Sequence, residues 1–328
     1  MPNLLEAARN PLAYLSRRWT PSRDVLRRAT TAAVVMSVVI VVTGGAVRLT
    51  GSGLGCDTWP KCTDDSLFAT REMGLHGAIE FGNRMLTYVL SAAVGWVIVA
   101  VRCAEPRRRG LSRLAWAQFW VVMGNAVLGG VTVRTGLNPY SVAGHFLLAT
   151  ALITLTVLTW QRVREGAAPP RPLVSARIRW STRALTGVAA ALVVVGTLVT
   201  GAGPHAGDAR EVHRIDWVGW ETITRVHASL AWALVLLTAV LWFLLRAGDA
   251  PPGPRARARE LAVVLASQVV VGYAQYLADM PELLVGIHLL GSTLVWIAVV
   301  RVLLAMRARD DAPAAAPGPA AERPAVPA

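Results

Sequence analysis

The sequence contains little charge and little cysteine. Charged residues make up 16% of the 328 positions, and there are three cysteines, none of them in a CxxC pair. So few thiols, without that spacing, argue against a structural zinc site. Hydrophobic residues make up 54% of the chain, and the mean hydropathy is +0.46. This composition is unusual for a soluble protein and indicates a chain that lies largely in a membrane.

The two ends of the chain lack apolar runs. Residues 1–28 are basic, contain three prolines and are too polar for a cleavable signal peptide, so none is expected. The last residues are rich in proline and alanine, and residues 307–328 are predicted to be a disordered tail.

Between these ends lie eight apolar runs of about 20 residues, the length that crosses a bilayer as a helix. They cover approximately residues 29–49, 78–101, 114–133, 142–161, 182–201, 224–245, 260–278 and 283–305. The predicted fold class is therefore all-α, a polytopic membrane protein with eight transmembrane helices.

The formal net charge of +13 comes from arginines that gather in every second loop. These basic segments precede the first run, follow the second, fourth and sixth runs, and follow the last. The other loops hold ten of the 20 acidic residues. By the positive-inside rule, both termini are cytoplasmic and the acidic loops are outside. This distribution accounts for the basic charge without a nucleic-acid partner, and none is predicted.

The eight runs form two related halves. The first run ends in Thr50-Gly51-Ser52-Gly53, and the fifth ends in Thr200-Gly201-Ala202-Gly203. His145 follows Asn138-Pro139 and His288 follows Met280-Pro281, and the two histidines are 143 residues apart. We therefore predict two pseudo-symmetric four-helix bundles, residues 29–165 and 182–306, joined by a cytoplasmic linker at 166–181. Both halves begin on the same side, so the repeat is parallel.

Three histidines fall inside the apolar runs, where an ionisable side chain is costly and indicates function. His145, His227 and His288 all lie near the outer ends of their runs. Two histidines on facing helices can ligate a heme iron from opposite sides, and His227 and His288 are predicted to be such a pair. The small residues Gly286 and Gly291 are expected to leave room for the macrocycle. Hydrogen bonds from each histidine to a carbonyl across a helix interface are the alternative.

The first half lacks a complete histidine pair equivalent to His227 and His288. His145 matches His288, but Asn83 stands 144 residues before His227. The nearest histidine, His76, lies two helical turns away, about 10 Å nearer the outer surface. The first-half heme is therefore expected to have His145 as its strong ligand and an open or exchangeable sixth position. Such a heme could bind a ligand or act as a replaceable substrate. Glu80 shares the face of Asn83 and is a candidate for proton transfer; an ion pair with Arg84 at i+4 is the alternative.

The outer loops hold two further candidate groups. Cys56 and Cys62 have five residues between them on the oxidising side, which favours a disulfide, either structural or redox-active. Four arginines at the outer rim depart from the positive-inside pattern and are candidate contacts for heme propionates, with lipid headgroups as the alternative: Arg48, Arg84, Arg134 and Arg225.

Several of these segments together resemble heme A synthases of the actinobacterial type. The matching stretches lie between about residues 30 and 305, and they are residues 43–45, 50–56, 59–62, 80–84, 128–133, 138–139, 200–208 and 281–288. Each motif is weak alone, and the set is specific. Where many members of this family have a histidine, this chain has Asn83.

The resemblance implies a reaction and its partners. Such enzymes oxidise a methyl group of heme O to a formyl group through hydroxylated intermediates and use a heme b cofactor. Carried over by position, His227 and His288 would bind heme b, His145 would face the substrate heme with Asn83 or His76 beside it, Glu80 would be catalytic, and Cys56 and Cys62 would be the outer disulfide. The implied partners are heme O, the bilayer of the cell membrane, a heme O synthase and an electron donor, with a homo-oligomer left open.

Two other functions compete with this interpretation. A diheme electron-transfer cytochrome would require two bis-histidine pairs, and Asn83 interrupts one. A heme transporter would be expected to have broken helices near the membrane midplane, whereas the polar residues here lie at the outer rim.

Overall fold

The computed structural model describes residues 9–205, 207–208 and 213–310. Within them, eight helices are long and apolar enough to cross a membrane. They are α3 (Arg23–Leu49), α4 (Gly74–Cys103), α5 (Arg109–Arg134), α6 (Pro139–Arg164), α7 (Ala176–Ala202), α8 (Trp220–Ala247), α9 (Pro252–Leu277) and α10 (Glu282–Ala305). The shorter elements are α2 (Pro11–Ser16), the 3-10 turn η1 (Arg71–Met73) and the strands β1 (Arg171–Pro172) and β2 (Arg307–Ala308). The predicted all-α polytopic fold is confirmed.

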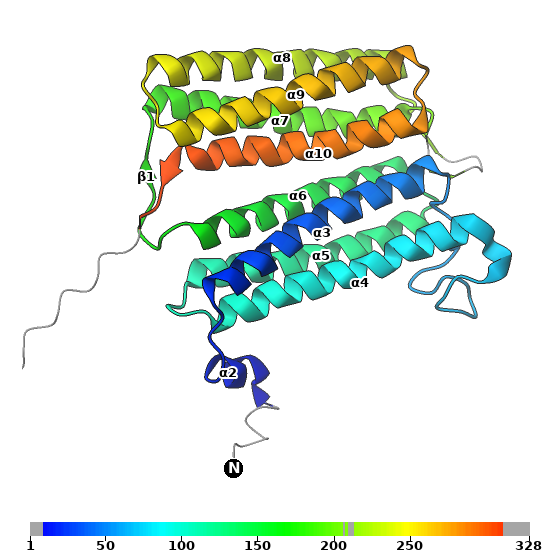
Figure 1. Ribbon diagram of the computed structural model, residues 1–328. Coiled ribbons are helices and arrows are strands. Elements are labelled where there is room, and N and C mark those ends of the chain that lie inside the picture. The colour runs from blue at the N-terminus through cyan, green and yellow to red at the C-terminus, as the bar shows by residue number, and fades with distance from the viewer. Residues whose placement is uncertain (1–8, 206, 209–212, 311–328) are drawn as a thin grey trace, which may run out of the picture.

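The eight helices form two four-helix bundles that lie side by side (Figure 1). In the first, α3 packs against α4 and α6, and α5 packs against the same two helices. In the second, α7 and α9 each pack against α8 and α10 in the same pattern. Each bundle has its own apolar core, built around Val94 and Val97 in the first and around Leu234 and Leu241 in the second. In each bundle, the second and fourth helices are therefore diagonal neighbours across the centre.

The two bundles meet through α3, α6, α7 and α10. A third apolar cluster joins Val41 of α3, Ile153 and Val157 of α6, and Val300 and Leu304 of α10. Helix α3 contacts α10, and the equivalent helices α7 and α6 contact each other, while α6 contacts its own counterpart α10. This reciprocal pattern is that of an approximate twofold axis between the halves.

The repeat extends to the backbone of the outer turns. Leu137 and Met280, which are 143 residues apart, both adopt left-handed conformations, with φ of 58° and 61°. The N–H of Leu137 donates to the carbonyl of Thr132 at 2.9 Å, and that of Met280 donates to Gln275 at 2.8 Å. The turns before α6 and before α10 are therefore the same structure, which sets His145 and His288 at equivalent positions.

Most helices are longer than the apolar runs that predicted them. Helix α3 begins at Arg23, six residues before the predicted span, and α9 begins at Pro252 rather than near residue 260. Arginine favours helical backbone, and its long side chain can reach polar surroundings from a helix end. The basic segments therefore continue the helices beyond the apolar part.

The predicted tail starts too early at residue 307. β2 pairs antiparallel with β1 of the linker, and Arg171 donates to Asp310 at 2.8 Å. The Arg171 guanidinium holds the pKa of the exposed Asp310 carboxyl below its usual range. The chain is thus ordered by pairing with the linker through residue 310, and residues 311–328 of the predicted tail lie outside the described residues.

Candidate functional site

Each of the three intramembrane histidines lies against a glycine of the preceding helix. A Cβ on Gly129 of α5 would lie 3.2 Å from Cε1 of His145. The corresponding distances are 3.1 Å between Gly196 and His227 and 3.4 Å between Gly272 and His288. Gly129 and Gly272 are 143 residues apart, as are their histidines. The glycines let each imidazole lie directly on a helix backbone, so they set the position of the ring.

The three rings share one orientation. The Nδ1 atoms of His145, His227 and His288 are buried and form no hydrogen bond of normal geometry within the described part of the chain. The backbone carbonyls of Asn125 and Leu192 approach the rings of His145 and His227. The buried nitrogen faces the neighbouring helix in each case, so Nε2 is the nitrogen available to a ligand.

His227 and His288 come from diagonal helices, α8 and α10, of the second bundle. They are close enough to interact electrostatically, although α8 and α10 are each packed against α7 and α9. Two partly buried imidazoles on diagonal helices of one apolar bundle are the donors that would hold a heme iron between them. The two imidazoles, with Nε2 of each available to a ligand, therefore fit a heme in this half.

In the first bundle the equivalent diagonal helices are α4 and α6. Asn83 of α4 has its Nδ2 atom 3.9 Å from the position of a Cβ on Gly44 of α3. Like His227 in the second bundle, it thus lies near a glycine of the preceding helix. Its carboxamide is bonded to the hydroxyl of Thr43, 2.8 Å away. The first bundle therefore presents His145 on one side and a neutral amide on the other.

His76 lies two turns nearer the outer end of α4. Its Nδ1 atom is hydrogen-bonded to the hydroxyl of Ser52 at 2.9 Å, and its backbone carbonyl packs against Gly55. The structure thus places it among the outer loops rather than beside Asn83.

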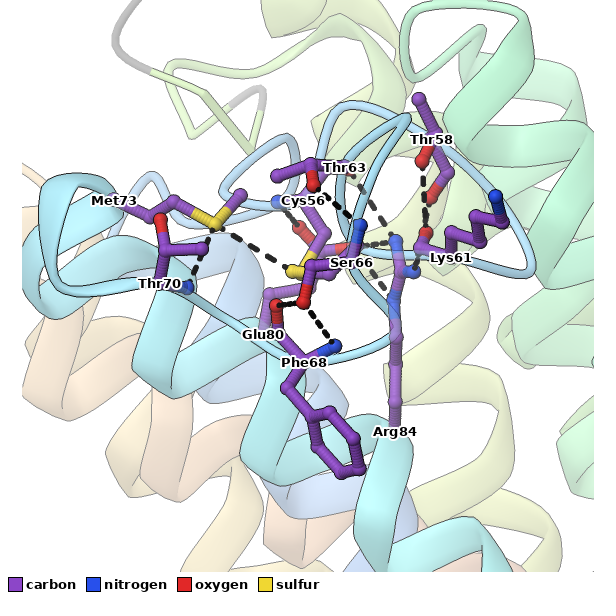
Figure 2. The surroundings of a disulfide bond; sticks show 11 residues. Cys56, Thr58, Lys61, Thr63, Ser66, Phe68, Thr70, Met73, Glu80 and Arg84 are labelled. Atoms are coloured by element: carbon purple, nitrogen blue, oxygen red, sulfur yellow. Dashed lines mark hydrogen bonds and ion pairs between the residues drawn. A yellow bond between two sulfur atoms is a disulfide. The ribbon is translucent and has the colours of Figure 1, made fainter.

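Glu80 is 5% exposed and joins α4 to the disulfide loop, residues 56–62 (Figure 2). Its Oε2 accepts the backbone N–H of Cys56 at 2.7 Å, and its Oε1 accepts from Arg84. The Arg84 guanidinium also donates to the carbonyls of Thr58 and Lys61 at 3.0 Å each. The pairing at i+4 that we considered as an alternative is present, and it binds the loop to the helix that carries Asn83.

Cys56 and Cys62 form a disulfide, as predicted, and both are fully buried. Within the loop that they close, the indole of Trp59 lies against Gly130 of α5, where a Cβ would be 2.5 Å from the ring. The carbonyl of Trp59 accepts from Arg134 at 3.0 Å. The loop therefore bridges α4 and α5 above the His145 side of the first bundle.

Arg48 has a role that the sequence did not indicate. It donates to the carbonyl of His205 at 2.7 Å and to that of Thr200, at the end of α7, at 2.9 Å. His205 in turn donates from Nε2 to the carbonyl of Met280 at 2.8 Å. An arginine of the first half thus holds the outer loop of the second. Arg225, the other rim candidate, is exposed and pairs with Glu221 on its own helix.

The two glycines expected to make room for a macrocycle do not do so. Gly286 faces the side chain of Leu49 across the interface between the halves, and the carboxamide of Gln268 lies directly over Gly291. The glycines that face the histidines, Gly129, Gly196 and Gly272, were missed. The shared offset of Gly129 and Gly272 was the signal that could have found two of them.

The similarity of the chain to known proteins agrees with the family that the sequence motifs indicate. A heme A synthase of Azorhizobium caulinodans is 27% identical over 328 aligned positions, covering 82% of this chain and 90% of that protein. Heme A synthases of Lysinibacillus sphaericus and Listeria monocytogenes are 27% and 31% identical over 173 residues, about half of this chain. The chain spans only 55% of the length of these last two relatives. The family described as cytochrome oxidase assembly protein (COX15-CtaA) matches residues 27–300, and the chain belongs to this family of multi-pass membrane proteins.

Proposed function

We propose that the protein is a heme A synthase, which oxidises a methyl group of heme O to a formyl group through hydroxylated intermediates. The observation that carries the proposal is the asymmetry of four equivalent positions. Three hold histidine and one holds Asn83, each over a glycine of the neighbouring helix. One bundle can therefore ligate a heme from both sides, as a permanent cofactor requires. The other can ligate it from one side, as a replaceable substrate requires.

His227 and His288 would hold heme b through their Nε2 atoms. When bound, heme b supplies electron-transfer chemistry that the side chains of the chain lack. His145 would bind the iron of heme O in the first bundle. The buried contacts of each Nδ1 edge with a helix backbone fix the ring planes before any heme binds.

Glu80 would handle a proton at the outer end of the first bundle. Its two carboxylate oxygens are held by the Cys56 N–H and by Arg84. A carboxylate fixed in this way is suited to accept or return a proton at a defined point, or to stabilise positive charge on the substrate. Arg84 and Arg134 tie the disulfide loop to α4 and α5, and their remaining N–H groups are candidates for propionate contacts.

The proposed setting is the cell membrane, with both termini cytoplasmic. The basic ends of α3, α5, α7 and α9 share one side, and the segment between α3 and α4, which contains the disulfide loop, lies on the other (Figure 1). Heme O synthase and an electron donor are the expected partners, because the substrate must be delivered and its oxidation needs electron exchange.

The test is chromatography of hemes extracted from membranes of a host that makes heme O but no heme A. Expression of this chain should produce heme A or its hydroxylated precursor, whereas His145→Ala should not. Heme O alone, with the protein present and carrying two bis-histidine hemes, would favour an electron-transfer cytochrome. Movement of unaltered heme across the membrane would favour a transporter.

A further inference from the structure

The four equivalent positions differ in a second residue besides Asn83. The residue before the glycine is Thr43 in α3 and Val195 in α7. The hydroxyl therefore occurs only in the half where asparagine replaces histidine. Thr43 and Asn83 are hydrogen-bonded to each other at 2.8 Å. The two differences thus form one local structure, a carboxamide anchored by a hydroxyl.

The anchor leaves one end of the carboxamide without a partner. The Thr43 hydroxyl lies 2.9 Å from the carbonyl of Val39 as well as 2.8 Å from Oδ1 of Asn83. The Nδ2 atom of Asn83 lies toward Gly44, and among the described residues it forms no hydrogen bond. Asn83 is only partly buried, and its Nδ2 is not one of the enclosed polar atoms without a partner, so this N–H is open to a ligand.

The length of the Asn83 side chain also bears on whether it can ligate the iron. Asn83 is shorter than the histidine at the equivalent position, and the Thr43 bond holds it back toward α3. Its amide is also a poor iron ligand compared with imidazole. His76 is bonded to Ser52 about two turns away and is not placed to substitute for it.

We infer that Thr43 and Asn83 together keep the sixth coordination position of the first-half heme open and donate a hydrogen bond to a small ligand bound there. Asn83 is thus a positioning residue that acts on the ligand of the iron, opposite His145. The inference rests on the proposed function, because it requires a heme in the first bundle. It adds an accessible face and a hydrogen-bond donor to that site.

The test is carbon monoxide binding to the reduced, full-length protein that carries both hemes. One of the two hemes should bind carbon monoxide. Asn83→His should abolish this binding by completing a second bis-histidine pair. Asn83→Leu and Thr43→Val should keep the binding but raise the C–O stretching frequency and weaken affinity about fivefold, the factor expected for one neutral hydrogen bond. Val195→Thr, the matched change in the second half, should alter neither.

Two results would overturn the inference while leaving the proposed function intact. The first is a wild-type protein with two hemes and no carbon monoxide complex; restoration of the complex by His76→Ala would then identify His76 as the sixth ligand. The second is an unchanged C–O frequency in both Asn83→Leu and Thr43→Val. A heme content that is the same with and without His145→Ala would instead remove the first-half heme, and with it the proposed function.

Discussion

The indole ring of Trp59 lies on Gly130 of α5, next to the glycine that faces His145. Because Trp59 belongs to the loop closed by the disulfide, the position of that loop and the position of the His145 ring are set on adjacent residues of one helix.

A methyl group at this contact should lift the loop. In Gly130→Ala the new Cβ would lie 2.5 Å from the Trp59 ring, so the ring must move. We expect a stability loss of about 1–3 kcal/mol, typical of overpacking, and slower heme conversion with unchanged second-half heme. Thermal unfolding in detergent and heme extraction check this. Gly124→Ala, on the same helix, meets only the end of Leu148, and equal effects of the two changes would contradict the role of the Trp59 contact.

The glycine beneath a histidine should control heme binding. In Gly196→Ala the added methyl would lie 3.1 Å from Cε1 of His227, which displaces the ring from its ligating position. We expect weaker retention of heme b during purification, measured by pyridine hemochrome. Gly187→Ala in the same helix meets nothing within 4 Å and should be neutral or stabilising by up to about 1 kcal/mol.

Substitution of the histidines in the two halves should remove different hemes. His227→Ala and His288→Ala should each deplete heme b, because each removes one of two axial ligands. His145→Ala should retain heme b and lose the first-half heme. Visible spectra and heme stoichiometry separate the cases, and full occupancy with an unaltered spectrum in His227→Ala would remove this residue from the ligand set.

Glu80 should be needed for conversion and not for cofactor binding. Glu80→Ala removes the acceptor of the Cys56 N–H and the partner of Arg84, so heme O should accumulate while heme b remains. Glu80→Gln keeps an acceptor for Cys56 and tests the charge alone. The exposed pair of Glu221 and Arg225 is the control, since Glu221→Ala should cost less than about 1 kcal/mol. Loss of all heme in Glu80→Ala would show a structural role instead.

Arg48 should stabilise the contact between the halves. Arg48→Met removes the donors to the carbonyls of His205 and Thr200. Each lost hydrogen bond that leaves a shielded carbonyl unpaired costs about 1–3 kcal/mol, so the thermal midpoint should fall. Arg71→Ala, an exposed arginine of the outer surface, should change it little; similar midpoints for both variants would show that Arg48 does not join the halves.

Regular features along the sequence allowed the fold to be predicted. Apolar runs locate the eight helices, and the matching spacing of His145 and His288 indicates the repeat. A spacing of 144 residues, one more than between those histidines, indicates that Asn83 stands in the place of His227, and the glycine contacts support this.

The remaining features depend on contacts between distant segments. Arg48 and His205 are 157 residues apart, and no local pattern relates them. The roles of Gly286 and Gly291 were mistaken because a small residue leaves space that the packing of other side chains decides. The Thr43 partner of Asn83 likewise depends on how α3 and α4 are rotated against each other.

The outer loops of the two halves are interlocked. Gly53 donates to the carbonyl of Gly207 at 2.8 Å, Ser52 and Asp208 form a β-bridge, and Arg48 closes the same junction. Each bundle therefore receives part of its cover from the other. Because α6 also packs against its own counterpart α10, a single bundle of this kind has a self-complementary face and an incomplete cover. Either half taken alone would therefore expose the helix face that now packs against its counterpart and would lose part of its outer cover.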